Sequence, residues 1–359
     1  MDLKEILKQN LIQQDVLDEF IIDLAWSPNG NYLAAITGSG QVALANMKAD
    51  VAWSELGRHK QGANCMKWHP RESLLASGGQ DGKLTVWETS SMSAAWSKEI
   101  GGWIDCLSWS SLGHFLASSY RKNLSIWSVS GKHEQIWTDH ESTISDIEWS
   151  PDGRFIGATA KGGITIRKYG GLDTTQQLQW HGVPIKMAWQ PNGKHIAMGD
   201  EEAIHFWEVE TGMHQPLFGY KSKVSKMSWS SESKFLATSD KENLVIWDCC
   251  PQNSRNEDLF PLAFLVSQKS LVGPGGTSPI LLRKHKGEIN SLLFQKEGEL
   301  LVSGDENGEV YIWDLQKSKM PVESIALGYP ISKIAWSPDG HRIVVGGEDG
   351  TVSIFTLDI

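Results

Sequence analysis

The sequence predicts an all-β fold in which eight similar four-stranded sheets form one ring. Three observations lead to this prediction: an unusual number of tryptophans, an aromatic residue that recurs about every 40 residues, and a second column of residues with the same period. The chain has 17 Trp among 359 residues. Because Trp is rare in average proteins, its recurrence at a fixed interval indicates one structural role that is repeated along the chain.

An aromatic residue followed by a reverse turn marks each repeat. Successive members of this first column are 40 to 42 positions apart, except for one interval of 65. The turn is clearest where it reads Ser-Pro-Asp-Gly, at 150–153 and 337–340, because Pro presets its second residue and Gly takes the positive φ that closes it. The first column consists of Trp26, Trp68, Trp109, Trp149, Trp189, Trp229, Phe294 and Trp336.

A second column lies 18 or 19 residues after the first and keeps its period. The residues five and two positions before each first-column aromatic are apolar, which favours a short half-buried strand, and their odd spacing predicts a bulge. A hairpin and a less regular fourth stretch follow, and four antiparallel strands in about 40 residues make one blade of a β-propeller. The second column consists of Ala45, Trp87, Trp127, Arg167, Trp207, Trp247, Trp313 and Phe355.

Counting these units predicts one eight-bladed propeller over residues 1–359. Seven blades are the alternative, in which the unit of Trp26 or that of Trp336 is an embellishment, although both carry the full turn signature. The two columns agree on a single insertion, which predicts a long loop over residues 250–278.

The last predicted third strand ends at Phe355, so the eighth blade lacks a fourth strand of its own. We expect residues 1–17 to supply this closing strand or a short N-terminal extension, because an unpaired strand edge exposes backbone groups. A short helix over Leu3 to Gln14 is the alternative. The candidates for the closing strand are Leu11, Ile12, Val16 and Leu17.

Trp-Asp pairs end two of the predicted third strands, at 247–248 and 313–314, and a histidine precedes the first strand in four units, at His59, His140, His181 and His285. Together with the Ser-Pro-Asp-Gly turns, these features resemble the WD40 family over nearly the whole chain. The resemblance implies that this His bonds within its own blade to an Asp, which helps to fix a Ser or Thr and the third-strand Trp. We expect the complete network only in the second unit, with His59, Ser77, Asp81 and Trp87.

The other units depart from this pattern. Asn307 stands at the expected Asp position of the seventh unit and Arg121 at that of the third, so packing must hold these blades. Arg167 occupies the Trp column of the fourth unit. An Arg in such a place either extends from the core to water or pairs with an acid, and we favour a surface blade edge.

We expect no metal and no cofactor. The four histidines lie on separate blades, whereas zinc needs ligand atoms about 2.0–2.3 Å from one centre. No Gly-x-Ser-x-Gly, His-Glu-x-x-His or phosphate-loop motif occurs.

Three aspartates near the inner strands are candidates for chemistry in the channel, but we favour a hydrated polar lining for them. They are Asp23, Asp105 and Asp146. We expect Cys65 and Cys106 to be small buried residues that pack in the core. Cysteines 249 and 250 are adjacent, and we expect no disulfide between them because the side chains of neighbouring residues diverge.

The bulk properties narrow the class of partner. The net charge is −10 and the pI is about 5.6, which disfavours non-specific binding to nucleic acid or to a membrane surface. The first residues mix charged with apolar positions, unlike a secretory signal, and no apolar run is long enough to span a membrane. With four cysteines at unpatterned spacings, we expect a soluble, monomeric protein of a reducing compartment, namely the cytoplasm.

Function is predicted to be protein binding without catalysis, because the repeated residues serve architecture and the unrepeated ones lie in loops. The alternatives are an enzyme or small-ligand binder that uses the channel, and nucleic-acid association through a local basic patch. We expect the partner on the face that carries the turns between second and third strands, where a basic arc gives way to an acidic arc that suits a basic segment. The candidate contact residues are Phe20, Trp103, Tyr120, Arg121, Asp200, Glu201, Glu202, Tyr220, Asp240, Glu306 and Tyr329.

The inserted loop gives a first testable prediction. Its stretch Leu259–Val266 is too apolar to remain free in water, so it either folds back on the blade edge or docks a partner. We expect deletion of Gln252 to Gly276 to leave a folded propeller with one cooperative thermal transition. Loss of that transition in a melting experiment would show instead that the segment belongs to the core.

Overall fold

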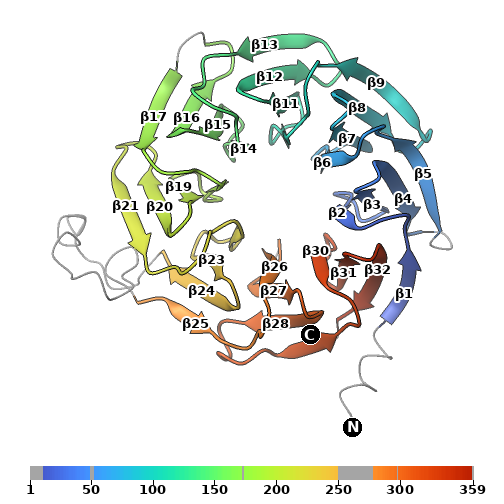
Figure 1. Cartoon of the computed structure of the whole chain (residues 1–359), viewed down its shortest axis with the longest axis vertical. Helices are drawn as coiled ribbons and strands as arrows, with labels where there is room; N and C mark the ends of the chain where they lie inside the picture. Colours follow the sequence, from blue (N-terminus) through green and yellow to red (C-terminus); the bar gives the residue numbers. More distant parts are fainter. Residues whose placement is uncertain (1–10, 49–51, 172–173, 250–277, 297, 358–359) are drawn as a thin grey trace.

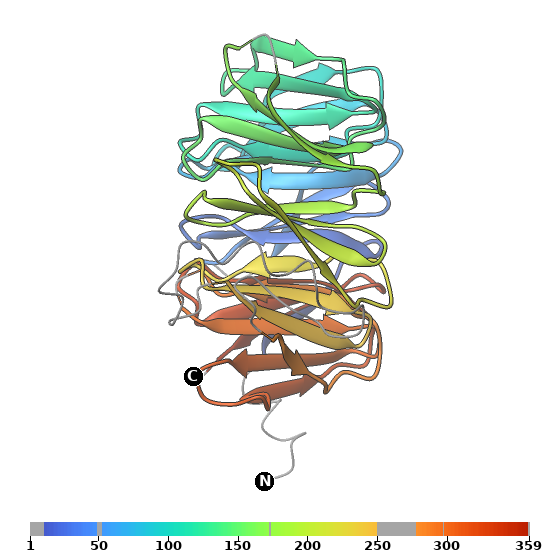
Figure 2. The same cartoon turned by 90° about the vertical axis from the view of Figure 1, so that its left-hand side faces the viewer.

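The computed structural model describes residues 11–48, 52–171, 174–249, 278–296 and 298–357. These residues contain 32 strands and no helix, arranged as eight antiparallel four-stranded sheets. The sheets surround a central axis like the blades of a propeller, with β2, β6, β14, β26 and β30 nearest the axis (Figure 1), and the molecule is disc-like when viewed from its edge (Figure 2). The prediction of eight blades rather than seven is therefore confirmed.

Each of the first seven blades is a meander of consecutive strands, with the first strand innermost. Blade 1 contains β2 (Ile21–Trp26), β3 (Tyr32–Thr37), β4 (Gln41–Asn46) and β5 (Trp53–Arg58); blade 2 contains β6 (Ala63–Trp68), β7 (Leu74–Gly79), β8 (Lys83–Glu88) and β9 (Ser93–Glu99); blade 3 contains β10 (Cys106–Trp109), β11 (Phe115–Tyr120), β12 (Asn123–Ser128) and β13 (His133–Trp137); blade 4 contains β14 (Asp146–Trp149), β15 (Phe155–Ala160), β16 (Gly162–Lys168) and β17 (Thr174–Trp180).

The second half of the ring follows the same plan. Blade 5 contains β18 (Lys186–Trp189), β19 (His195–Gly199), β20 (Ala203–Glu208) and β21 (His214–Phe218); blade 6 contains β22 (Met227–Trp229), β23 (Phe235–Asp240), β24 (Asn243–Asp248) and β25 (Ile280–Leu282); blade 7 contains β26 (Ile289–Phe294), β27 (Leu300–Asp305), β28 (Glu309–Asp314) and β29 (Glu323–Ala326); blade 8 contains β30 (Ile331–Trp336), β31 (Arg342–Gly347), β32 (Thr351–Thr356) and β1 (Leu11–Val16).

The bulge expected in the first strand occurs in four blades. In these blades the pairing register between the first and second strands shifts near the start of the first strand. The residue that opens each of these strands is buried, at Ile21, Ala63, Ile289 and Ile331. The bulge lets two apolar side chains at an odd spacing both face the core.

The first-column tryptophans join neighbouring blades. In six blades the indole N–H donates a hydrogen bond of 2.9–3.2 Å to a backbone carbonyl in the innermost strand of the preceding blade. The indoles of Trp68 and Trp109, for example, donate to the carbonyls of Ala25 and Lys67. A Trp side chain suits this position because it fills the seam between blades and also carries a donor.

The eighth blade is completed by the N-terminal segment. β1 runs antiparallel to β32, with Leu11 opposite Phe355 and Val16 opposite Thr351. Leu11–Gln14 is therefore strand, and the remaining residues of the alternative helix, from Leu3 on, lie outside the described part of the chain. The inserted loop over 250–277 also lies outside it, between β24 and β25.

The pairing of β1 with β32 gives a second prediction. Removal of Met1 to Val16 should leave the backbone edge of β32 unpaired, lower the Tm by about 5 °C or more and promote aggregation. A matched truncation of residues 1–10 keeps β1 and should melt close to the full chain. Differential scanning calorimetry measures both. If the chain without residues 1–16 melts like the full one, β1 does not hold the ring closed.

Candidate functional site

The loops of the propeller form two faces. The Trp103 face carries the turns between second and third strands and the segments that lead into the first strands, including Trp103. The Pro151 face carries the turns between first and second strands, including Pro151, and the turns between third and fourth strands. The candidate contact residues lie on the Trp103 face.

Trp103 is the most exposed tryptophan among the described residues, with 57% of its surface accessible. It stands in the segment between β9 and β10 and borders a pocket of about 500 Å³. Gly82, Gly101 and Gly102 form part of the wall, and Asp105 and Arg121 contribute charged groups. The backbone N–H of Arg121 donates to the Asp105 carboxylate at 3.3 Å, while burial raises the pKa of Asp105.

Three further candidates lie on the same face with accessible surface. Phe20 is 39% exposed and lies against Gly38, where a Cβ atom would be only 2.2 Å from its ring. Tyr120 is half-buried beside Gly102, and Arg121 is exposed in a left-handed conformation with φ of 52°. Together with Trp103 these residues give blades 1 and 3 aromatic groups that a partner can reach.

The structure corrects the assignment of Tyr220 and Tyr329 as contact residues. Both are buried, with 7% of each side chain exposed. The Tyr220 hydroxyl accepts a hydrogen bond of 2.7 Å from the Trp247 indole and is 2.7 Å from the Thr238 hydroxyl. The Tyr329 hydroxyl donates to Ser353 at 2.7 Å. Tyr220 stands nine residues before Trp229, as His59 does before Trp68, so column alignment alone could have shown that Tyr220 replaces the histidine.

Asp200 and Asp240 are also removed from the contact set because each is 7% exposed. The Asp200 carboxylate accepts from the Trp180 indole and bonds His205 Nε2, both at 2.9 Å. Asp240 accepts from the backbone N–H of Lys221 at 2.8 Å. These carboxylates hold the loops of blades 5 and 6 rather than face a partner.

The remaining acidic candidates, Glu201, Glu202 and Glu306, are exposed. The acidic arc is less uniform than the turns alone predict, because the segments that lead into blades 6 and 7 add basic side chains. These exposed basic residues are Lys221, Lys223, Arg283, Lys284 and Lys286, and Lys241 adds another from the turn between β23 and β24. An uninterrupted acidic stretch is therefore confined to blade 5, and to Glu348 and Asp349 of blade 8.

The structure brings the four expected network residues of blade 2 together. His59 lies 3.0 Å from Asp81 through Nδ1 and 2.8 Å from Ser77 through Nε2, and the Trp87 indole donates to Ser77 at 2.8 Å. When Nδ1–H donates to Asp81, the Ser77 hydroxyl donates to Nε2, and this assignment satisfies every group in the chain of bonds.

Blade 7 has an equally complete network, which sequence reasoning missed. His285 lies 2.8 Å from Asp305 and 2.7 Å from Ser303, and Trp313 donates to Ser303 at 2.9 Å. Asp305, not Asn307, is the acid, because the carboxylate reaches the histidine from a position two residues earlier. His59 and His285 are thus occupied within their own blades, and no three His, Cys, Asp or Glu side chains converge on a metal position within the described ranges.

Arg167 is buried, with 2% exposed, so the expectation of a surface blade edge is wrong. Its guanidinium donates to both oxygens of Asp139 at 2.6 and 2.7 Å and lies 5.4 Å from the ring centroid of Trp137. Pairing with an acid, the other alternative, is what blade 4 uses in place of the histidine network.

Charged side chains of the innermost strands form pairs across blade boundaries. Lys186 lies 2.8 Å from Asp146, and Lys333 lies 2.9 Å from Asp23. Burial raises the pKa of Glu148 to about 7, and its carboxylate accepts from the Trp189 backbone at 2.9 Å. Burial likewise raises the pKa of Cys106 to about 12, which keeps this thiol protonated at neutral pH. Two of the three candidate aspartates thus have lysine partners, and Glu148 is the titratable group that sequence reasoning did not single out.

The ring of eight blades, the indole bonds between blades and the histidine networks define a WD-type propeller. Two family models match accordingly: "Anaphase-promoting complex subunit 4 WD40 domain" over residues 2–69 and 24–111, and "WD domain, G-beta repeat" over 131–166, 213–248, 276–314 and 324–356. The chain therefore belongs to the WD40-repeat β-propeller family. No helix in the described residues is long and apolar enough to cross a membrane.

Sequence relatives match short parts of the chain. The human U3 small nucleolar RNA-associated protein 4 homolog is 37% identical over 73 residues, which is 20% of this chain and 11% of that protein. Histone-binding protein MSI1 of Saccharomyces cerevisiae is 34% identical over 20% of this chain and 18% of its own length. Protein transport protein SEC31 of Eremothecium gossypii is 29% identical over 33% and 11%. The aligned part thus spans less than a fifth of each of these relatives.

A solved structure of the computationally designed Ika8 protein superimposes on the chain with a TM-score of 0.77. The superposition covers 97% of this chain and 99% of the designed one at 16% sequence identity. At this identity the similarity shows the fold alone. It agrees with eight blades assembled from repeated strands and short turns.

The blade 7 network gives a third prediction. Ser303→Ala leaves both the Trp313 indole and His285 Nε2 buried without a partner, so we expect the free energy of unfolding to fall by at least about 2 kcal/mol, since each such group costs about 1–3 kcal/mol. Ser118→Ala is the matched control, because Ser118 accepts only from Trp127 and should cost about half as much. Urea denaturation compares the two. Equal losses would contradict a role for His285 in the network.

Proposed function

We propose that the chain is a protein-interaction platform that binds its partner through the Trp103 face. The observation that carries the proposal is Trp103, more than half exposed beside a pocket of about 500 Å³. A large exposed aromatic is costly to leave in water, and Trp and Arg side chains are the usual anchors of protein interfaces. Trp103 and Arg121 border the same pocket, which gives a partner both an apolar and a charged contact.

The repeated residues support the same proposal. First-column indoles and the networks of blades 2 and 7 bond within the ring, so they are committed to architecture. Exposed side chains such as Phe20 and Trp103 have no such structural role in the described residues. The relatives named histone-binding and protein transport proteins are consistent with binding rather than catalysis.

The partner is proposed to carry a basic segment, since Glu201 and Glu202 are exposed on the same face and the net charge is −10. Such a partner would associate more slowly as salt rises, because screening weakens attraction between exposed charges. We propose that the propeller acts as a monomer in the cytoplasm, as its composition first indicated.

Small-ligand binding or catalysis at the innermost strands is the second candidate function, and Glu148 favours it. A carboxyl with a pKa of about 7 can exchange a proton near neutral pH. The nearby Lys186 is paired with Asp146, which supplies further charge at the same blade boundary.

Exchange of Trp103 for Ala should weaken partner capture by about tenfold or more, the loss typical of an aromatic hot spot. Leu112→Ala is the matched control, because Leu112 is 46% exposed in the same blade on the opposite, Pro151 face. Quantitative mass spectrometry of proteins captured from the native cell compares both variants with the parent chain. A partner retained equally by the two variants would contradict binding at Trp103.

The charge component needs a separate variant. Glu201→Lys with Glu202→Lys should slow association and reduce its dependence on salt, whereas a change at Asp200 would break its bonds to Trp180 and His205 and confuse the result. Surface plasmon resonance on the captured partner measures both effects. An unchanged association rate would remove the basic segment from the proposal and leave the role of Trp103 standing.

A further inference from the structure

On the Pro151 face, the residue two positions after the second column packs, in seven of the eight blades, against a core cluster shared with the preceding blade. At the seam of blades 3 and 4 this residue is Tyr169, whose ring centroid lies 4.1 Å from that of Phe115 in the preceding blade. Phe115 also stacks on Trp149, with centroids 6.3 Å apart. Tyr169 and Phe115 pack against one core cluster, so the aromatic ring completes the seam.

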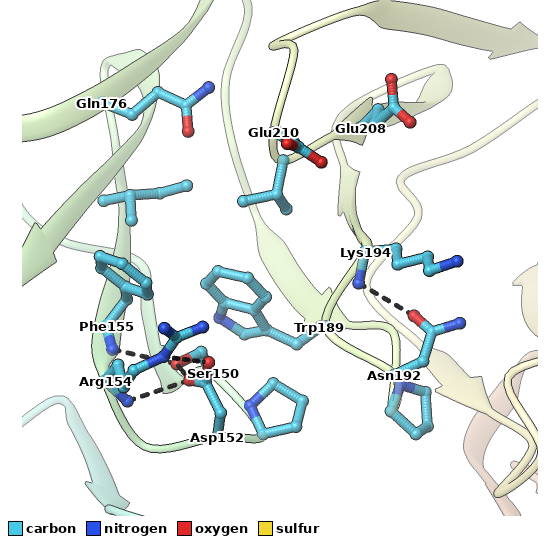
Figure 3. A pocket seen from close by; sticks show the side chains of 15 residues that line it. Ser150, Asp152, Arg154, Phe155, Gln176, Trp189, Asn192, Lys194, Glu208 and Glu210 are labelled. Carbon is cyan, nitrogen blue, oxygen red and sulfur yellow. Dashed lines mark hydrogen bonds and ion pairs between the residues drawn. The ribbon is translucent and has the colours of Figure 1, made fainter.

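At the next seam, between blades 4 and 5, a smaller side chain stands in this position. Phe155 corresponds to Phe115, Trp189 to Trp149, and Val209 to Tyr169, each at the same distance from its column residue. Phe155 and Val209 again pack against a shared core cluster. Valine has no ring to lay on Phe155, and a pocket of about 810 Å³ opens there (Figure 3). We call it the seam pocket.

The seam pocket has an apolar floor and a charged edge. Phe155, Ile166, Trp189 and Val209 line the floor. Two carboxylates border the pocket (Figure 3): Glu208 ends β20, and Glu210 lies in the turn that follows, two positions later in the sequence. On the other wall, Arg154 is paired with Asp152 at 2.6 Å and lies 5.6 Å from the centroid of Phe155.

We propose that the seam pocket binds an aromatic side chain of a partner protein, presented next to a lysine or arginine. The chain itself shows what fits, because Tyr169 fills the equivalent seam with an aromatic ring against Phe115. The volume lies within the range of about 300–1,000 Å³ that is usual for binding pockets. Arg154 is already paired with Asp152, and the carboxylates of Glu208 and Glu210 outnumber Lys194, the other basic side chain of the lining. The edge is therefore acidic and favours a basic neighbour of the ring.

This site is independent of the proposed function at Trp103, since it lies on the opposite face and on different blades. A partner bound at both faces would contact the ring through two separate anchors. Loss of binding at one face therefore leaves binding at the other intact, and the two proposals fail or stand separately.

The test uses the full chain and three synthetic peptides: acetyl-Gly-Lys-Tyr-Lys-Gly-amide, the same peptide with Ala for Tyr, and the same peptide with Glu for both Lys. Saturation-transfer NMR titration measures their affinities. We expect the Lys-Tyr-Lys peptide to bind at least about tenfold more tightly than either of the other two. Equal affinity of the three peptides would overturn the proposal.

Variants locate the binding. Val209→Tyr supplies the ring that Tyr169 supplies at the neighbouring seam, and it should abolish binding of the Lys-Tyr-Lys peptide without lowering the Tm. Val129→Tyr is the matched control, because Val129 holds the same position at the seam of blades 2 and 3, against Leu74. Binding should persist in this control. Undiminished binding by a folded Val209→Tyr chain would overturn the proposal.

A second variant keeps the test decisive if Val209→Tyr does not fold. Glu208→Gln with Glu210→Gln removes the negative charge but leaves the apolar floor. This variant should bind the peptides with Lys and with Glu equally well, and it should still bind the peptide with Tyr more tightly than the peptide with Ala. If the preference for Lys survives in this variant, the two glutamates do not select the partner and the proposed chemistry is wrong.

Discussion

The hydrogen bond from an indole N–H to a carbonyl of the preceding blade is the interaction on which the ring depends. It couples six of the blades to the innermost strand of the preceding blade. Phe294 in blade 7 has no such donor, and Trp26 in blade 1 has no hydrogen-bond partner in the described residues. At the latter seam, where blade 8 meets blade 1, Arg342 lies 4.9 Å from the Trp26 ring and Lys333 pairs with Asp23. A cation–π contact and an ion pair thus stand in place of the indole hydrogen bond at the seam between blades 8 and 1.

The fold could be predicted from the sequence because the residues that specify each blade recur at a nearly constant interval. Two columns with one shared insertion specify the number of blades, and the apolar positions before each aromatic specify the inner strands. The networks within blades were harder to predict. Asp305 reaches His285 from two residues before the expected place, and Tyr220 substitutes for a histidine, because a hydrogen bond requires proximity in space and not a fixed residue type. Such contacts also bury Asp200 and Tyr329. Prediction from charge and aromatic character alone therefore assigned too many residues to the partner-binding surface.

The candidate binding sites lie where side chains differ between blades. Trp103 occupies a segment that differs from blade to blade, and Val209 leaves Phe155 without the ring that Tyr169 lays on Phe115 at the neighbouring seam. Sequence reasoning found Trp103 because an unrepeated aromatic in a loop is conspicuous. It missed the seam pocket because a valine in an apolar column looks ordinary, and only the position of Tyr169 on Phe115 reveals what the valine leaves uncovered.

The pairing of β1 with β32 also governs when the molecule can fold. Leu11 and Phe355 pair although 343 residues separate them in the sequence, so blade 8 stays incomplete until β32 has emerged from the ribosome. The other blades are local meanders and can form as they emerge, since their contacts span about 40 residues or fewer. β1 is synthesised before the other strands but pairs after them, so its backbone groups stay unpaired during translation. Seven blades can thus assemble progressively, while ring closure is a single late event that carries the entropy cost of joining distant segments.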